Sequence, residues 1–267
     1  MSYEIIALDI DGTLTNSQKE ITPATLDALI DIQSKGKKAV LASGRPTPGL
    51  TKFAKMLHMD EYGGFLLSYN GAKIINYQTK EAVVNQTLPQ DVIPVLYNFA
   101  KEHNVGIITY ENGGVISGNG MDEYIELEAR INGIPVKEVD NFPEYVDFPV
   151  NKCLMTGDAD YMALMEQELN ELLGDRLSIY RSEAFFLEIM PNNVDKANSL
   201  DILLKSLSYD KEQLIACGDG YNDMSMISYA GLGVAMDNAK PEVKEVANYI
   251  TKSNDEDGVL HVIEKYI

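Results

Sequence analysis

The segment from Ile5 to Thr13 constrains the fold of this chain more than any other. It reads Ile-Ile-Ala-Leu-Asp-Ile-Asp-Gly-Thr, an apolar run that ends in two carboxylates, a glycine and a hydroxyl. A short apolar run of this kind is typical of a buried strand. In open α/β sheets, reactive groups gather beyond the carboxyl ends of the strands. The segment therefore predicts a functional edge of an α/β sheet.

Asp9 and Asp11 suggest the chemistry at that edge. They are two residues apart, so on an extended backbone both lie on the same side, and Gly12 lets the chain leave the strand with its amides facing inward. Two carboxylates this close repel each other unless a cation lies between them, and Mg²⁺ is usually held by one or two carboxylates together with substrate phosphate. A simpler interpretation is an Asp-Gly turn beside a surface acid, since both residues are common in turns.

A second acidic loop lies far along the chain, where the apolar run Leu214–Cys217 ends in Gly-Asp-Gly-Tyr-Asn-Asp, residues 218–223. The two loops can meet only if their strands are neighbours in one sheet. Their convergence would gather four aspartates, Asp9, Asp11, Asp219 and Asp223, enough negative charge to require a metal and to tolerate a phosphate.

Two further segments lie between these loops in the sequence. Lys38–Ala42 predicts a strand that runs into Ser43-Gly44-Arg45, and a hydroxyl and backbone amides at a strand-to-helix turn suit a phosphate oxygen. Lys196 opens another predicted helix and offers a point charge to the same group. A lysine near a helix start is also common as a solvated side chain, so neither segment is decisive alone.

Together, the four segments resemble the ordered motifs of the haloacid dehalogenase superfamily of phosphohydrolases. The motifs are Asp-x-Asp-Gly-Thr at residues 9–13, the serine at Ser43, the lysine at Lys196 and Gly-Asp-Gly-x-Asn-Asp at residues 218–223. Ser68–Ala72 and Phe186–Pro191 are similar to the Cof-type branch, and residues 243–248 to its YidA-like sugar phosphatases. The sequence departs from many relatives at Ala197, where they have glycine.

The resemblance implies a Mg²⁺-dependent two-step phosphoryl transfer. Asp9 is the expected nucleophile, and Asp11 the expected general acid and base, which requires that neighbouring carboxylates and a closing cap raise its pKa. Mg²⁺ is expected on Asp9, the backbone carbonyl of Asp11, Asp219 and Asp223. The phosphate is expected among Ser43, Lys196, Gly12, Gly44, Arg45 and Asn222.

Alternating strand and helix patterns predict an α/β fold with crossover helices. Residues 83–189 carry none of the four motifs yet have strands and helices of their own. We therefore expect a Rossmann-like parallel-sheet core, residues 1–82 and 190–267, with an inserted α/β cap domain at 83–189. The expected linkers lie near Glu81–Asn85 and Glu188–Asn192, and the cap placement resembles the C2B-like caps of the Cof-type branch.

The composition limits which binding partners and which location the protein can have. The 267 residues carry a formal net charge of −19, so a nucleic acid or an anionic membrane would meet repulsion, although excess acid can also serve only solubility. Cys153 and Cys217 form no paired framework, and no stretch approaches the length of a membrane span. The first residues lack the basic leader of a secretory signal. We expect a cytoplasmic protein; its oligomeric state stays open.

Other functions fit part of this pattern. A phosphomutase of the same superfamily would use the same aspartyl-phosphate but return the group to a bound sugar. A signalling receiver domain is also phosphorylated on an Asp at the end of a strand. Such a domain needs no second acidic residue two positions later, and it is normally much shorter than this chain. A magnesium-dependent binding protein would show no turnover. The resemblance favours a phosphatase of small phosphorylated metabolites, sugar phosphates above all, with pyridoxal phosphate and flavin mononucleotide as alternatives.

Overall fold

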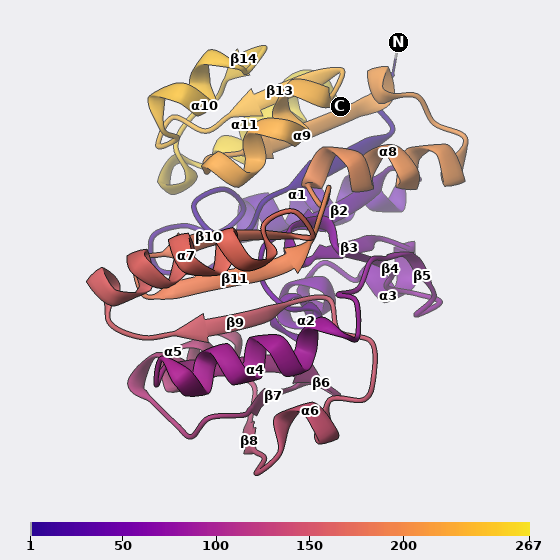
Figure 1. Ribbon diagram of the computed structural model, residues 1–267. Coiled ribbons are helices and arrows are strands. Elements are labelled where there is room, and N and C mark those ends of the chain that lie inside the picture. The colour runs from indigo at the N-terminus through magenta and orange to yellow at the C-terminus, as the bar shows by residue number, and fades with distance from the viewer. Residues whose placement is uncertain (1) are drawn as a thin grey trace. The chain divides into compact units, whose positions relative to one another are not determined.

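The computed structural model describes residues 2–267, and the chain folds as two compact units (Figure 1). The first, the core unit, comprises the chain up to Val84 together with Asp195–Ile267. The second, the inserted unit, is Asn85–Val194. Each unit contains a sheet of its own.

The core unit is built on a sheet of eight strands in the order β14-β13-β12-β1-β2-β3-β4-β5. The neighbours from β14 to β3 are parallel, and β4 is antiparallel to β3. The strands are β1 (Ile5–Leu8), β2 (Lys38–Ala42), β3 (Phe65–Ser68), β4 (Lys73–Asn76), β5 (Ala82–Asn85), β12 (Leu214–Gly218), β13 (Leu232–Ala235) and β14 (Tyr249–Ile250).

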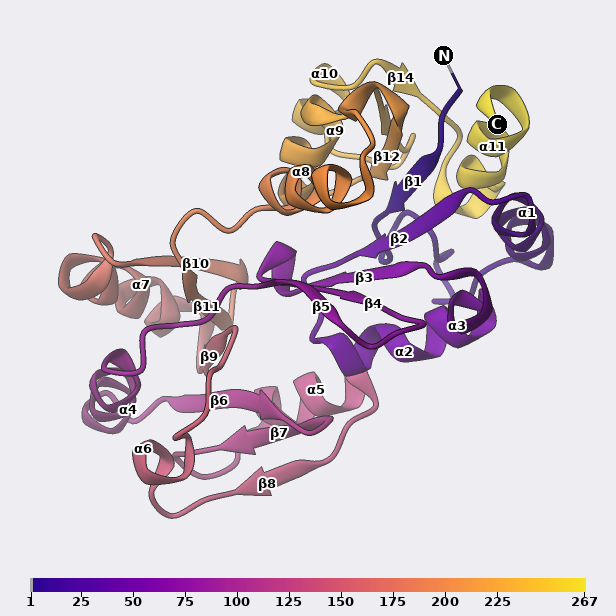
Figure 2. The same cartoon turned by 90° about the vertical axis from the view of Figure 1, so that its right-hand side faces the viewer.

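Helices cover both faces of this sheet, which explains the continuous apolar sequence of β1. Ile6 and Leu8 pack in one core cluster and Ile5 and Ala7 in another. Figure 2 shows α1 and α11 on one side of the sheet and α8 and α9 on the other. The helices of the unit are α1 (Pro23–Ser34), α2 (Thr47–Met56), α3 (Met59–Tyr62), α8 (Lys196–Leu207), α9 (Met224–Tyr229), α10 (Pro241–Glu245) and α11 (Gly258–Tyr266).

Short 3-10 helices η1 (Tyr69–Gly71), η2 (Lys211–Gln213), η3 (Tyr221–Asp223) and η4 (Asn254–Glu256) complete the core unit. Local sequence explains where the helices begin. At α1 the Thr22 hydroxyl accepts a hydrogen bond from the Thr25 N–H, and Pro23 follows as the first helical residue, because proline lacks the N–H that a first turn cannot pair.

The inserted unit has six strands in the order β10-β11-β9-β6-β7-β8. Helices α4 and α7 pack on one face of this sheet (Figure 1), and Ile125 and Ala129 of α5 pack on the other. Its elements are α4 (Val92–Glu102), β6 (Gly106–Glu111), β7 (Gly114–Ser117), α5 (Glu123–Asn132), β8 (Val136–Glu138), α6 (Phe142–Tyr145), β9 (Cys153–Thr156), α7 (Ala159–Leu173), β10 (Leu177–Glu183) and β11 (Phe186–Pro191).

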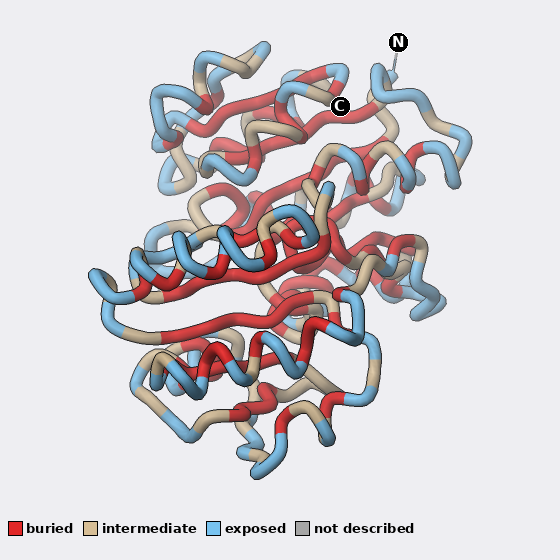
Figure 3. Tube along the Cα trace, viewed as in Figure 1, coloured by how far each residue is buried: buried red, intermediate tan, exposed pale blue. Residues whose placement is uncertain are grey.

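Burial follows this architecture: in Figure 3 the central strands of both sheets are red, edge strands such as β8 and β14 are not, and the helices alternate between buried and exposed residues. The α/β fold with a parallel core sheet is therefore confirmed. The first boundary between the units lies between Val84 and Asn85, within the expected linker Glu81–Asn85, although most of that segment is strand β5. The second boundary lies between Val194 and Asp195, because most of the expected linker Glu188–Asn192 belongs to strand β11 of the inserted unit. Among the described residues, no helix combines the length and the apolar character needed to cross a membrane.

Candidate active site

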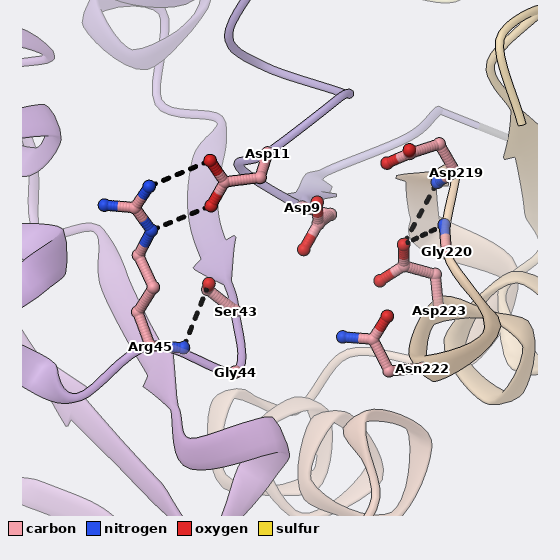
Figure 4. Close-up of a pocket in the computed structure, with 9 residues that line it drawn as sticks. All are labelled: Asp9, Asp11, Ser43, Gly44, Arg45, Asp219, Gly220, Asn222 and Asp223. Carbon is pink, nitrogen blue, oxygen red and sulfur yellow. Dashed lines mark hydrogen bonds and ion pairs between the residues drawn. The ribbon is translucent and has the colours of Figure 1, made fainter. Parts of the chain in front are cut away.

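Three adjacent parallel strands end at one edge of the core sheet and position the site. Strand β1 pairs with β12 on one side and with β2 on the other, so the residues after each strand converge as predicted. They surround a cavity of about 220 Å³ (Figure 4). Its lining residues are Asp9, Asp11, Ser43, Gly44, Arg45, Asp219, Gly220, Asn222 and Asp223.

The turn after β1 is fixed against the acidic loop after β12. Gly12 has φ +85°, and a Cβ on it would lie 2.4 Å from Oδ2 of Asp219, so only glycine fits here. The Thr13 hydroxyl donates a 2.9 Å hydrogen bond to Oδ1 of Asp219. On the other side of the turn, the Asn238 amide donates to the Gly12 carbonyl. Gly12 thus shapes the turn but does not line the cavity.

Three carboxylates form an acidic cluster at the bottom of this edge. Oxygens of Asp9, Asp219 and Asp223 lie within 4.8 Å of one another. Asp223 is fully buried, and its Oδ2 accepts hydrogen bonds from the N–H groups of Asp219 and Gly220 at 3.0 and 2.9 Å. In Figure 4 the three side chains face one another. The acidic loop therefore fixes the position of the Asp223 carboxylate through its own backbone.

Lys196 is the cation inside this cluster. It is the first residue of α8, whose N-cap Asp195 accepts a hydrogen bond from the Asn198 N–H. The Lys196 ammonium has no exposed surface and donates three hydrogen bonds, to Asp9 Oδ1 at 2.9 Å, Asp223 Oδ1 at 2.5 Å and the Ala42 carbonyl at 2.8 Å. The resemblance implies that Lys196 completes the phosphate cradle. The structure places it outside the cavity lining and against the carboxylates, so its contact with phosphate stays a prediction.

The electrostatics of the cluster favour a bound cation. Burial, with the charge of Asp223, raises the pKa of Asp9 to about 8 against the opposing effect of Lys196. Burial likewise raises the pKa of Asp219 to about 6, although the Thr13 hydrogen bond opposes it. Carboxylates whose negative charge is this unfavourable are stabilised by a second cation. An all-oxygen donor set suits a hard divalent ion.

Asp11 is turned toward a different partner. Its Oδ2 accepts from Arg45 Nε and its Oδ1 from Arg45 Nη2, both at 2.8 Å, and Lys19 Nζ lies 2.9 Å from Oδ1 (Figure 4 shows the Arg45 pair). Burial alone would raise the pKa of Asp11, but Arg45 and Lys19 outweigh it and lower that pKa. The expected raised pKa is therefore wrong for this conformation, because these cations stabilise the carboxylate.

The structure brings all ten predicted site residues to this edge of the sheet, and all but Gly12 and Lys196 line the cavity. The ten residues are Asp9, Asp11, Gly12, Ser43, Gly44, Arg45, Lys196, Asp219, Asn222 and Asp223. Ser43 Oγ accepts from the Arg45 N–H at 3.2 Å, and the Asn222 amide donates to Asn70 Oδ1 at 3.1 Å. Sequence reasoning assigned no role to Lys19 or Asn70. Lys19 carries no sequence signal in its loop, whereas Asn70 belongs to the Ser68–Ala72 segment, which was noted only for its resemblance.

Both cysteines are buried and free. Burial raises the pKa of the Cys153 thiol to about 12, and burial with the nearby charge of Asp223 raises that of Cys217 as well. A thiol with a raised pKa is a poor nucleophile. Cys217 lies at the carboxyl end of β12, beside the acidic loop, and these values support its interpretation as a packing residue.

Comparisons with known proteins agree with this geometry. The family model of haloacid dehalogenase-like hydrolases matches residues 6–263. A crystal structure of a haloacid dehalogenase-like hydrolase from Bacteroides thetaiotaomicron is 47% identical, with a TM-score of 0.96 and 100% of each chain covered.

Two curated proteins of Bacillus subtilis are also similar over nearly their whole length. "Putative phosphatase YxeH" is 31% identical over 99% of this chain and 98% of its own. The 5-amino-6-(5-phospho-D-ribitylamino)uracil phosphatase YcsE is 28% identical over 100% of this chain and 97% of its own. The family model spans almost the entire sequence, and the four motifs meet at one sheet edge, so the chain belongs to the haloacid dehalogenase-like hydrolases, as the resemblance predicted.

Proposed function

We propose that this protein is a Mg²⁺-dependent phosphatase that hydrolyses phosphate monoesters of small metabolites through an aspartyl-phosphate on Asp9. The observation that carries the proposal is the convergence of Asp9, Asp219 and Asp223 around one point, with Lys196 buried against two of them. The phosphatase names of the two Bacillus subtilis relatives support the reaction class.

The proposed site for Mg²⁺ uses the side chains of Asp9 and Asp219 and the backbone carbonyl of Asp11, with Asp223 and Asn222 holding its waters and the phosphate. A cation there would offset the negative charge between a carboxylate and a phosphate ester. The raised pKa values of Asp9 and Asp219 support this assignment, because burial and the charge of Asp223 disfavour the ionised carboxylates, and a cation would offset that effect.

In the first proposed step, an Asp9 carboxylate oxygen attacks phosphorus in line, the bond to the ester oxygen breaks, and Asp11 gives its proton to the leaving alkoxide. In the second step, Asp11 takes a proton from a water that attacks the same phosphorus, and the bond to Asp9 breaks. Lys196 orients the Asp9 carboxylate and opposes the rise of its pKa, and a bound cation would favour the ionised nucleophile further. Ser43, Gly44, Arg45 and Asn222 are the proposed phosphate contacts.

The state of Asp11 bears on this scheme. With its pKa lowered by Arg45 and Lys19, Asp11 is ionised at neutral pH in this conformation, which suits the base of the second step. Acting as the acid of the first step requires that the carboxylate exchange these cations for a proton. Arg45 is thus proposed to serve both the phosphate and the protonation state of Asp11.

Sugar phosphates are the proposed substrate class. The Bacillus subtilis relative YcsE is named for a substrate with a phosphorylated ribityl chain, which is chemically close to a sugar phosphate. We propose that the inserted unit, expected at residues 83–189, acts as the cap that selects the leaving group. The free thiols Cys153 and Cys217 support a reducing, cytoplasmic location, and the net charge of −19 argues against nucleic acid as a partner.

The test is phosphate release from a panel of metabolite phosphates, with and without Mg²⁺, by the wild type and by Asp9→Asn. We expect Mg²⁺-dependent release by the wild type and none by the variant, with labelled phosphate trapped on the wild-type protein during turnover. Release by a folded Asp9→Asn protein would rule out the covalent route. An isomerised sugar phosphate without free phosphate would indicate a phosphomutase instead.

A further inference from the structure

The segment Ser68–Ala72 has an unusual backbone beside the site, and none of the proposed catalytic roles uses it. Three consecutive residues adopt positive φ angles: Tyr69 at 53°, Asn70 at 51° and Gly71 at 110°. Positive φ is uncommon outside glycine and is energetically costly for a residue such as tyrosine. Such strain persists only where the surrounding structure enforces it, and it clusters at functional sites.

Contacts on two sides enforce this backbone. On the side of β2, the Tyr69 N–H donates to the Arg45 carbonyl and the Asn70 N–H to the Ser43 carbonyl, both at 3.0 Å. On the side of α8, the Ser199 hydroxyl donates to the Gly71 carbonyl at 2.7 Å. The segment therefore links the strand end that carries Ser43 with the first turn of the helix that carries Lys196.

Gly71 fits this place because the approach to α8 is close. A Cβ on Gly71 would lie 2.6 Å from the Asp195 carbonyl oxygen and 2.7 Å from the Ser199 hydroxyl. Together with its φ of 110°, this excludes other residues. The position of Asn70 is consequently set by backbone geometry on both of its sides.

The Asn70 side chain lies where the phosphate site is assembled. Only 8% of the residue is exposed, and its Oδ1 accepts the 3.1 Å hydrogen bond from the Asn222 amide. A Cβ on Gly44 would lie 3.1 Å from that same oxygen, so the Asn70 carboxamide packs directly against the Gly44 backbone. Asn70 thus contacts two residues that line the cavity, although it does not line the cavity itself.

The hydrogen bond orients the Asn222 amide. Asn222 Oδ1 lies over Gly220, where an added Cβ would be 2.7 Å away, and its Nδ2 points to Asn70. An amide nitrogen carries two N–H donors, so the bond to Asn70 leaves the second for a phosphate oxygen. A donor that is already held in place binds an anion without paying the full cost of ordering its side chain.

We propose that Asn70 is a positioning residue that aims the Asn222 amide at the phosphate; this rests on the proposed phosphatase function. The strained backbone of Ser68–Ala72 serves to place that one carboxamide. Loss of a neutral hydrogen bond predicts about a two- to tenfold weaker affinity for phosphate. A purely structural Asn70 would change stability and leave phosphate affinity unaltered.

Asn70→Gly separates these roles, because glycine accepts a φ of 51° but has no carboxamide. The probe is inorganic phosphate in the presence of Mg²⁺, with Kd measured by titration calorimetry. We expect Kd to rise about two- to tenfold, KM for p-nitrophenyl phosphate to rise alongside it, and kcat to change less. Asn104→Gly is the matched control: Asn104 has a φ of 50° and is exposed in the inserted unit, so its replacement should leave Kd unchanged.

A double-mutant cycle supplies the decisive readout. If Asn70 acts through Asn222, then Asn70→Gly combined with Asn222→Ala should bind phosphate no more weakly than Asn222→Ala alone. Multiplying losses would overturn the inference, as would a folded Asn70→Gly protein with wild-type Kd. Should Asn70→Gly not fold, the same cycle is run with Asn70→Ala, which also removes the acceptor of the Asn222 amide; losses that multiply with those of Asn222→Ala would again overturn the inference.

The outcomes separate this inference from the function on which it rests. A wild-type protein that neither binds phosphate nor releases it from any ester overturns both. A wild type that does both, with an unaltered Asn70→Gly variant, overturns the positioning role and leaves the phosphatase standing.

Discussion

Arg45 holds the carboxylate of Asp11 with two hydrogen bonds of 2.8 Å, one from Nε and one from Nη2. Such a two-point contact fixes the orientation of the carboxylate as well as its charge. Asp11 follows Asp9 by only two residues, yet its carboxylate is not part of the acidic cluster of Asp9, Asp219 and Asp223. The two carboxylates of the first motif therefore have opposite environments, with the pKa of Asp9 raised and that of Asp11 lowered.

Replacing Arg45 should move the pH dependence of turnover. Arg45→Met removes the cation that lowers the Asp11 pKa, so the ionised base should be lost at a higher pH than in the wild type. We expect the acidic limb of the kcat profile to shift upward in pH, with kcat reduced because the carboxylate is no longer oriented. Lys19→Met should shift it less, since the Lys19 side chain is 63% exposed and exposed pairs contribute little. An unmoved acidic limb in Arg45→Met would contradict this account.

Removing the Lys196 charge should cost both stability and activity. Burial alone would lower the pKa of Lys196, but Asp223 and Asp9 outweigh it and raise that pKa, so the ammonium stays charged. Lys196→Met leaves the buried carboxylates of Asp9 and Asp223 without their ammonium partner. The free energy of unfolding should therefore fall by about 3–5 kcal/mol. Urea denaturation measures this loss. Lys205→Met, in the same helix, removes an exposed pair with Asp201 and should cost at most about 1 kcal/mol.

The acidic cluster should make metal-free stability fall with rising pH. The pKa of Asp9 is raised from 3.8 to about 8 in the folded protein, so folding favours the protonated form. That contribution is complete below pH 4 and is lost as pH rises through 8. We expect Tm without metal to decline between pH 5 and pH 8, and Mg²⁺ to raise Tm most at the upper end. Asp9→Asn should flatten this decline, and an equal decline in that variant would count against the assignment.

Gly12 and Gly113 provide a matched pair of substitutions. Both have nearly the same φ, +85° and +84°, but a Cβ on Gly12 meets Asp219 at 2.4 Å, whereas Gly113 has nothing within 4 Å. Gly113→Ala should therefore cost only the backbone penalty, about 1–2 kcal/mol. Gly12→Ala should cost more and also weaken Mg²⁺ binding, because Asp219 must move. Unfolding and Mg²⁺ titration measure the two effects, and equal losses would argue against a role for the contact.

Much of the site was predictable because it depends on strand order. The runs Ile5–Leu8 and Leu214–Cys217 predicted neighbouring strands, and β1 and β12 pair in register along these residues. The Thr22-Pro23 start of α1 also follows from local chemistry. These features need only periodicity, capping and the rule that parallel strands end at the same edge.

Side-chain partners were less predictable. The direction of the Asp11 pKa was wrong because motif order says that Arg45 is near the phosphate but not that its guanidinium pairs with a carboxylate. Lys19, which donates a hydrogen bond to Asp11, has a positive φ of 62°. Tyr69 and Asn70 also have positive φ angles. No periodic pattern in the sequence reveals this backbone conformation. Loops held by tertiary contacts override local propensity, so their geometry has to be observed.

The pairing of β1 with β12 also dictates the order of events during synthesis. Thr13 reaches Asp219 across 206 positions of sequence, so the first motif leaves the ribosome long before its partner exists. Until then, one edge of β1 stays unpaired, and Asp9 has neither Asp219 nor Asp223 beside it. The acidic cluster of a nascent chain is therefore incomplete, and it forms only when β12 and the loop after it have been translated and have docked against the first strand.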